Sequence, residues 1–168
     1  MTSPRRYRKS VLPRAGAAAF GLVLLAALGG APALRAATTE RVVTDRHTGL
    51  AIYGVDPVAY FTNRKPVAGR AEFEFRFAGA TWRFDNASNR AAFVADPKVY
   101  MPRFGGYDPV GIARGVSTPG YPQLWVIAKD RLYLFYTAQA RTAFLVDPKA
   151  AVAAAEAQWP QVVQDLAE

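Results

Sequence analysis

The sequence predicts an α+β fold: a small single domain made of two pseudo-symmetric units, each combining a β-hairpin with a helix. Its 168 residues, 51% hydrophobic and 20% charged, have the composition of one globular domain. The alternation Phe73-Glu-Phe-Arg-Phe77 has the period of two that marks a half-buried strand. The segment from Arg90 to Lys98 recurs from Arg141 to Lys149, which indicates two copies of one unit sharing a core.

The two repeat units cover residues 54–101 and 106–152, and each begins with Gly-x-Asp-Pro-Val. Alternating apolar residues on either side of a short turn predict one hairpin in each unit. The expected strands are residues 73–77 and 81–84 in the first unit, and 124–128 and 132–135 in the second. Glycines and prolines are dense in residues 102–121, which predicts a long loop between the units. Such loops often carry function.

A helix is expected after each hairpin. Asn86 or Ser88 is suited to cap the first helix and Thr137 the second, because their side-chain oxygens can accept hydrogen bonds from free backbone N–H groups. A further, alanine-rich helix is expected over residues 150–157. Trp159-Pro160 is expected to end it, since proline lacks the N–H that a helix interior needs.

The first 36 residues have the organisation of an export signal. Residues 5–9 are Arg-Arg-Tyr-Arg-Lys, and an uncharged stretch from 15 to 34 ends in glycine, proline and alanine. This order predicts a signal peptide cleaved after Ala33 or Ala36, and the arginine pair permits a twin-arginine route. An uncleaved membrane anchor is the alternative. We therefore expect an exported protein, periplasmic or extracellular.

Charge and composition exclude several classes of partner and site. Six of the 21 lysines and arginines lie in residues 1–36, and the rest of the chain has 15 basic and 13 acidic residues. The net charge of +8 thus belongs mainly to the signal, so we expect no nucleic-acid partner, and membrane contact only through an uncleaved signal. The absence of cysteine excludes disulfides and thiolate metal sites, and His47 is the one histidine.

Several short motifs occur in a fixed order between residues 50 and 160. They include Gly54-Val-Asp-Pro-Val-Ala-Tyr-Phe61, Gly79-Ala-Thr-Trp-Arg-Phe84, Gly105-Gly-Tyr107 and Trp159-Pro160. In these motifs the chain resembles the exported YHS-domain proteins of bacteria. The resemblance implies a small α+β domain over residues 50–160. Residues 37–49 would then form an N-terminal extension, and residues 161–168 the end of the last helix.

The resemblance also bears on metal binding, which has been proposed for some YHS-domain proteins. Where these proteins commonly have Gly-Gly-Tyr-Cys, this chain has Gly105-Gly106-Tyr107-Asp108. The residue best suited to a soft metal is therefore replaced by a carboxylate, which suits a hard cation. We expect no cofactor, with a hard metal ion as the alternative.

Asp56 and Asp108 are the first candidate site residues, because they occupy equivalent positions in the two units. Two carboxylates brought together could hold a cation or perform acid/base chemistry. The competing interpretation is structural: Asp-Pro, which occurs four times, is a common helix start with Asp as the cap. If Asp108 is only a cap, replacement by Asn should have little effect on stability.

Tyrosines supply the remaining candidates. Most tyrosines should be core or strand residues. Tyr60 and Tyr107, however, lie beside the two Asp-Pro motifs. Together with tryptophans, the tyrosines could line a pocket for a flat ligand. The leading hypothesis is a non-catalytic binding or accessory module with a pocket near Asp56, Tyr60, Tyr107 and Asp108, for an unknown small ligand or protein partner. The alternatives are a metal-handling accessory protein with oxygen ligands and, less favoured, an enzyme with a carboxylate acid/base pair.

Overall fold

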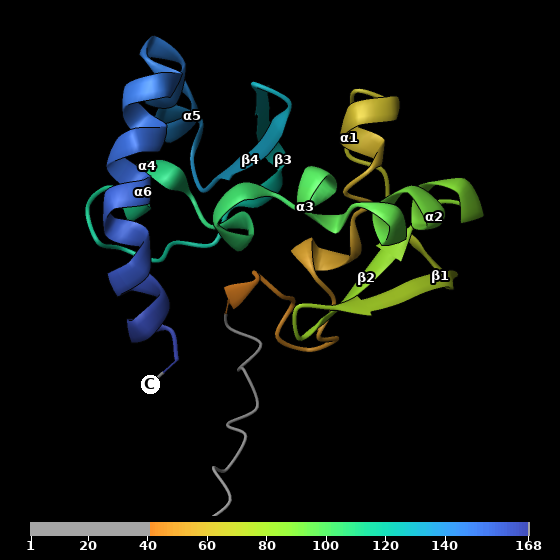
Figure 1. The fold of residues 1–168 in the computed structure, drawn as a ribbon. Coiled ribbons are helices and arrows are strands. Elements are labelled where there is room, and N and C mark those ends of the chain that lie inside the picture. The colour runs from red at the N-terminus through yellow and green to blue at the C-terminus, as the bar shows by residue number, and fades with distance from the viewer. Residues whose placement is uncertain (1–40, 168) are drawn as a thin grey trace, which may run out of the picture. The chain divides into compact units, whose positions relative to one another are not determined.

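The computed structural model describes residues 41–167, and the expected signal peptide in residues 1–36 lies outside this part of the chain. All described residues belong to one compact unit, shown in Figure 1. None of the helices in residues 41–167 has the length and apolar character needed to cross a membrane.

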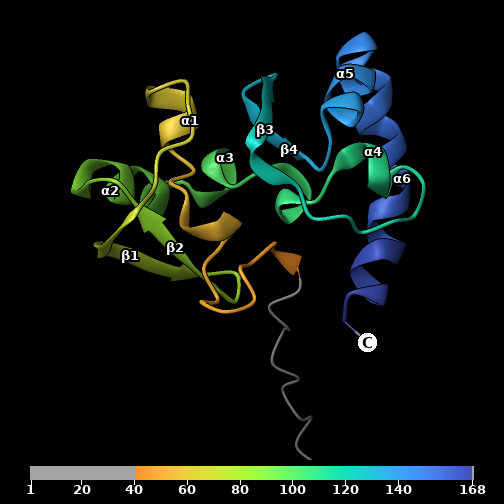
Figure 2. The same cartoon turned by 180° about the vertical axis from the view of Figure 1, so that it is seen from behind.

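The described elements form two halves with the same order of helices and strands. The first half contains η2 (Ile52–Gly54), α1 (Ala59–Thr62), β1 (Arg70–Phe77), β2 (Ala80–Phe84), α2 (Ala87–Ala95) and α3 (Pro97–Tyr100). The second half contains η3 (Arg103–Gly106), α4 (Pro109–Ile112), β3 (Tyr121–Ala128), β4 (Arg131–Phe135), α5 (Ala138–Val146) and α6 (Pro148–Asp165). These elements confirm an α+β fold with two antiparallel hairpins. Figure 2, seen from behind, shows α2 beside β1–β2 and the helices α4, α5 and α6 gathered beside β3–β4.

The two hairpins are built alike. Each has a two-residue turn in which both residues have positive φ: Ala78 and Gly79 in the first, Lys129 and Asp130 in the second. This turn geometry matches the right-handed twist of paired strands, which explains why a short loop suffices. The corresponding cross-strand pairs are Phe75–Trp82 and Val126–Tyr133, and each register is interrupted once, between Arg70 and Glu74 and between Tyr121 and Trp125.

A glycine before each hairpin permits the backbones to approach closely. A Cβ on Gly69 would lie 2.4 Å from the Cβ of Arg83, and one on Gly120 would lie 2.6 Å from the Cβ of Leu134. Both distances are shorter than non-bonded carbons tolerate, so each position requires glycine for space.

The core consists of two clusters, each centred on a buried phenylalanine from the helix after the hairpin. Phe93 of α2 packs on Trp82, with ring centroids 5.1 Å apart, and Phe144 of α5 packs on Tyr133 at 4.9 Å. Both phenylalanines are fully buried. The apolar face of each hairpin is thus covered by its own helix.

The helix caps follow the sequence prediction. The Asn86 side chain, rather than Ser88, accepts a hydrogen bond from the Asn89 N–H at the start of α2. Thr137 accepts one from the Ala140 N–H at the start of α5.

Three expectations about boundaries differ from the structure. The last helix does not end at Trp159-Pro160, because α6 runs on to Asp165. Burial of Val162 in the second core cluster stabilises the helix beyond Pro160, against the cost of about 3 kcal/mol that a proline brings to a helix interior. The predicted loop over 102–121 contains η3 and α4. Val42 and Val43 are buried in the two core clusters, so the domain begins before residue 50.

Candidate functional site

Asp56 is fully buried and accepts four hydrogen bonds. One carboxylate oxygen accepts from the backbone N–H groups of Val58 (2.8 Å) and Ala59 (3.3 Å), ahead of α1. The other accepts from the Asp85 backbone N–H at the end of β2 (2.9 Å) and from the Asn89 side-chain amide (2.6 Å). The carboxylate therefore ties the helix start to the end of the hairpin.

Asp108 has the same role in the second half. One oxygen accepts from the Val110 N–H at the start of α4 (2.8 Å), and the other from the Tyr136 N–H after β4 (3.0 Å). Asp108 is also nearly fully buried, with 3% of its surface exposed. Because both oxygens face backbone donors, an Asn side chain would turn one amide N–H toward another donor. The two native hydrogen bonds therefore favour a measurable loss of stability for Asp108→Asn over the small effect expected for a simple cap.

The two carboxylates belong to separate hydrogen-bond networks. The bonds of Asp56 run to residues of the first half and those of Asp108 to the second half. Both arrangements fit the capping interpretation of Asp-Pro, which Asp147 repeats by accepting from the Ala150 N–H. Asp96 makes no such side-chain bond. Within residues 41–167 no group of three or more histidine, aspartate or glutamate side chains is placed to hold a metal ion.

Tyr60 is a core residue in the structure. Its ring is fully buried and meets Trp125 edge-on at 5.3 Å, and its hydroxyl donates to the Pro122 carbonyl oxygen at 2.9 Å. Burial and, to a lesser extent, the nearby Asp56 carboxylate raise the pKa of Tyr60 well above its usual value of 10.0. The phenol therefore links the two halves of the domain in its neutral form.

Tyr107 lines a pocket, but the other three candidate residues do not. The pocket has a volume of about 440 Å³, and its other walls include Thr44, Arg46 and Ser117. The Tyr107 ring is nonetheless mostly buried and packs against Trp159, with centroids 6.3 Å apart. Of the four candidate residues, Tyr107 is the one that borders this pocket.

The exposed tyrosines form a stack rather than a pocket. Tyr121 stacks on Tyr53 at 6.4 Å and on Tyr136 at 5.4 Å, and all three are partly open to solvent. Trp82, in contrast, lies entirely within the core. The structure thus divides the aromatic residues between core packing and a surface stack.

A second pocket is lined by three arginines. Arg41, Arg103 of η3 and Arg131 of β4 share its walls with Glu156 of α6, and its volume is about 370 Å³. We call it the arginine pocket. Apolar side chains close the rest of it: Met101, Pro102, Phe104, Trp159 and others. Three cations against one carboxylate leave the walls with excess positive charge.

The three arginines of this pocket differ in their hydrogen bonding. Arg103 donates to the Glu156 carboxylate and lies over the Phe104 ring at 5.4 Å. Among the described residues, Arg131 Nε is the one buried side-chain nitrogen or oxygen without a hydrogen-bond partner. Burial, followed by the neighbouring positive charge of Arg103, lowers the pKa of Arg131 from its ordinary value. Both observations mark a guanidinium that an anion would stabilise.

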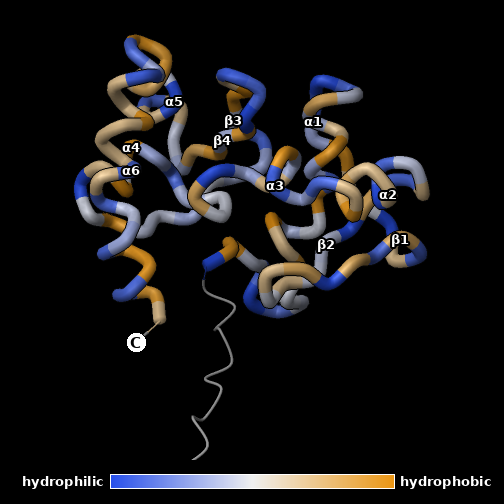
Figure 3. The backbone as a smooth tube through the Cα atoms, viewed as in Figure 1, coloured by the Kyte–Doolittle hydropathy of each residue, from blue (hydrophilic) through white to orange (hydrophobic). Residues whose placement is uncertain are grey.

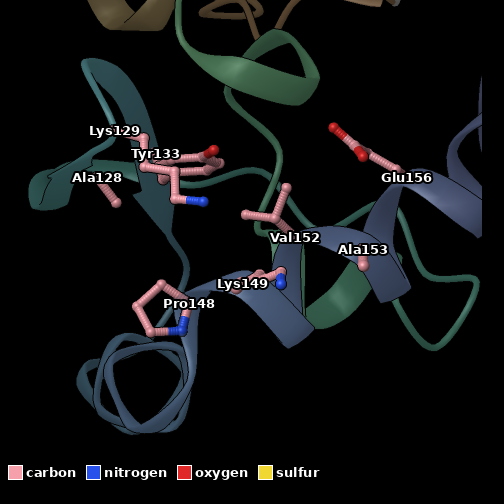
Figure 4. A pocket seen from close by; sticks show the side chains of 8 residues that line it. All are labelled: Ala128, Lys129, Tyr133, Pro148, Lys149, Val152, Ala153 and Glu156. Atoms are coloured by element: carbon pink, nitrogen blue, oxygen red, sulfur yellow. The ribbon is translucent and has the colours of Figure 1, made fainter.

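A third pocket adjoins the arginine pocket through Glu156, which lines both. It lies between the end of the β3–β4 hairpin and α6, with a volume of about 300 Å³, and we call it the apolar pocket. Figure 4 shows the Tyr133 ring from the hairpin facing Val152 from α6, with Ala153 one residue further along the helix. Lys129 and Lys149 also line it.

Sequence reasoning missed the arginine pocket. Arg103 and Arg131 lie 28 residues apart, and Glu156 a further 25 along the chain. Each looks like an ordinary surface charge until the fold brings them together. A weak signal was present, since Arg103 precedes the glycine pair that Tyr107 follows, and this segment was expected to carry function.

Comparison with protein-family models, with curated proteins and with solved structures finds no match to this chain.

Proposed function

We propose that this protein is an exported, non-catalytic binding module of the YHS type, and that it binds a small anion in the arginine pocket. The observation that carries the proposal is the gathering of three arginines around one pocket, one of which, Arg131, has a buried Nε without a hydrogen-bond partner. A buried donor without a partner costs about 1–3 kcal/mol, and the cost is greater for a charged group. An oxyanion in the pocket would supply the missing acceptor.

Arginine is well suited to this role. Its planar guanidinium offers parallel N–H donors that match the oxygens of a carboxylate or phosphate. The Glu156 carboxylate, already held by Arg103, shows the type of group that these walls accept. The excess of arginine over glutamate leaves charge for one further anion.

The hydrogen bonds of Asp56 and Asp108 favour a binding module over the alternatives. A metal-handling protein or an enzyme with a carboxylate pair would need these oxygens directed toward a shared site. Here both carboxylates accept backbone N–H bonds within their own halves. We place ligand binding at the arginine pocket instead of at the Asp-Pro motifs.

We further propose that the two halves are pseudo-symmetric copies of one YHS-like unit. The repeated element order, the corresponding cross-strand pairs and the two equivalent Asp carboxylates support this proposal. The signal-like residues 1–36 support export to the periplasm.

The function can be tested by thermal denaturation in acetate or phosphate, compared with chloride at equal ionic strength. A ligand that binds only the folded protein raises its melting temperature. We expect acetate and phosphate to stabilise the protein, and Arg131→Met to abolish the effect. Arg114→Met is the matched control, since Arg114 is exposed and lines none of the three pockets. Equal stabilisation of the two variants would contradict the proposal.

A further inference from the structure

The arginine pocket and the apolar pocket both lie along α6 and share Glu156 as a lining residue, and we call the two together the groove. Residues 149, 152, 153 and 156 of α6 line the apolar pocket, and residues 156, 159 and 160 line the arginine pocket. Spacings of three and four place these positions on one face of a helix. The groove therefore follows this helix face from its N-terminal turn to Pro160.

The opposite wall comes from the second hairpin. Arg131 lines the arginine pocket and Tyr133 lines the apolar pocket, and both lie on β4. Residues two apart on a strand point to the same face, so the two side chains face α6 together. Burial raises the pKa of the Tyr133 phenol above its usual value, while the positive charges of Arg103 and Arg131 act in the opposite direction.

The chemistry changes along the groove. The arginine-pocket end is lined by Arg131, whose buried Nε has no partner, and its walls carry an excess of positive charge. At the other end, most of the wall is hydrocarbon or aromatic: Ala128, Tyr133, Pro148, Val152 and Ala153. A ligand that fills both parts must therefore combine an anionic head with an apolar body.

We propose that the ligand of this groove is a small amphipathic carboxylic acid, with its carboxylate on Arg131 and its apolar body between Tyr133 and Val152. This inference rests on the proposed anion-binding function and specifies its ligand class. A volume of about 300 Å³ in the apolar pocket accommodates a short alkyl chain or a single aromatic ring. Lys129 and Lys149 extend the positive charge around this part of the groove.

Titration calorimetry on the full chain with three compounds tests the inference. Hexanoate has head and body, acetate has the head alone, and hexanamide has the body without the charge. We expect hexanoate to bind at least about tenfold more tightly than acetate, because each buried methylene contributes to affinity. We expect hexanamide to bind at least about tenfold more weakly than hexanoate, because Arg131 is left without an anionic acceptor.

Two variants separate the two parts of the groove. Arg131→Met should weaken hexanoate and acetate alike by about tenfold or more. Ala153→Phe fills the apolar pocket from an exposed helix position, so it should weaken hexanoate about tenfold and leave acetate within twofold. Ala154→Phe is the matched control, since Ala154 is exposed and lines neither part of the groove, and it should change neither affinity.

The outcomes distinguish the inference from the proposed function. If acetate binds through Arg131 but hexanoate binds no more tightly, or Ala153→Phe behaves like Ala154→Phe, the amphipathic ligand is refuted and anion binding stands. If no acid binds, or if binding is unchanged in Arg131→Met, the proposed function fails and the inference fails with it. Equal affinity for hexanamide and hexanoate would also refute both the proposed function and the inference.

Discussion

Replacing Asp108 by asparagine tests whether this buried carboxylate has a structural role that requires both of its oxygens. In the native protein the oxygens accept from the Val110 N–H at 2.8 Å and from the Tyr136 N–H at 3.0 Å. Asparagine retains one oxygen, and its amide nitrogen would face the second N–H donor. The substitution therefore breaks one of two hydrogen bonds and leaves a partly buried donor without an acceptor.

The magnitude follows from these two bonds. A hydrogen bond to a charged group contributes about 1.5–3 kcal/mol, and an unsatisfied buried donor costs a similar amount. Asp108→Asn should lower the free energy of unfolding by about 1.5–3 kcal/mol. Asp108→Ala loses both bonds and should cost roughly 3–5 kcal/mol. A domain of this size has a free energy of unfolding of about 5–15 kcal/mol in total, so the alanine variant should lose a large share of its stability.

Asp147 provides the matched control for a urea denaturation measurement. It also precedes a proline and caps a helix, but a single oxygen accepts one bond, from the Ala150 N–H at 3.0 Å. Asp147→Asn keeps that acceptor and should change stability by less than about 0.5 kcal/mol. If Asp108→Asn is as well tolerated as Asp147→Asn, the two-oxygen role assigned to Asp108 is refuted.

Three further substitutions have expected outcomes. Tyr60→Phe should cost about 1 kcal/mol through loss of the bond to the Pro122 carbonyl. The raised pKa of Tyr60 gives stability that is present below pH 10.0 and is lost as the pH rises above it, so the variant should lose less stability at alkaline pH than the wild type. A plot of wild-type stability against pH that is no steeper than that of the variant would contradict the assignment. In urea denaturation without added anions, Arg131→Met should raise the free energy of unfolding by about 1 kcal/mol, because an unsatisfied buried donor disappears. A clear loss of stability would show that the Arg131 Nε has a partner. Gly120→Ala should cost at least about 1–3 kcal/mol by thermal melting, because its Cβ would meet the Leu134 Cβ; a silent substitution would show that the backbones can separate.

Local patterns predicted the secondary structure well. The alternation around Phe75 and the turn residues near Gly79 lie within single elements, where short-range rules apply. The helix caps at Asn86 and Thr137 are likewise local. The continuation of α6 past Pro160 could not be predicted in this way, because it depends on the burial of Val162 against distant residues.

The candidate site was harder to predict for the same reason. Asp56 and Asp108 occupy matching places in the sequence repeat, but only the fold shows that each carboxylate bonds to the end of its own hairpin. The arginine pocket depends on Arg103, Arg131 and Glu156, which come from three separate elements. No spacing rule joins such residues, since tertiary packing alone brings them together.

The Nε–H resonance of Arg131 gives the most direct test of anion binding in the arginine pocket. In an NMR titration of the full chain with acetate, at constant ionic strength set by chloride, this signal should shift saturably as the unpartnered nitrogen gains an acceptor. The Nε–H signal of exposed Arg114 should stay in place. A saturable change at Arg131 alone is the result that our account predicts. An unchanged Arg131 signal, or equal and unsaturable shifts of both arginines, would contradict it.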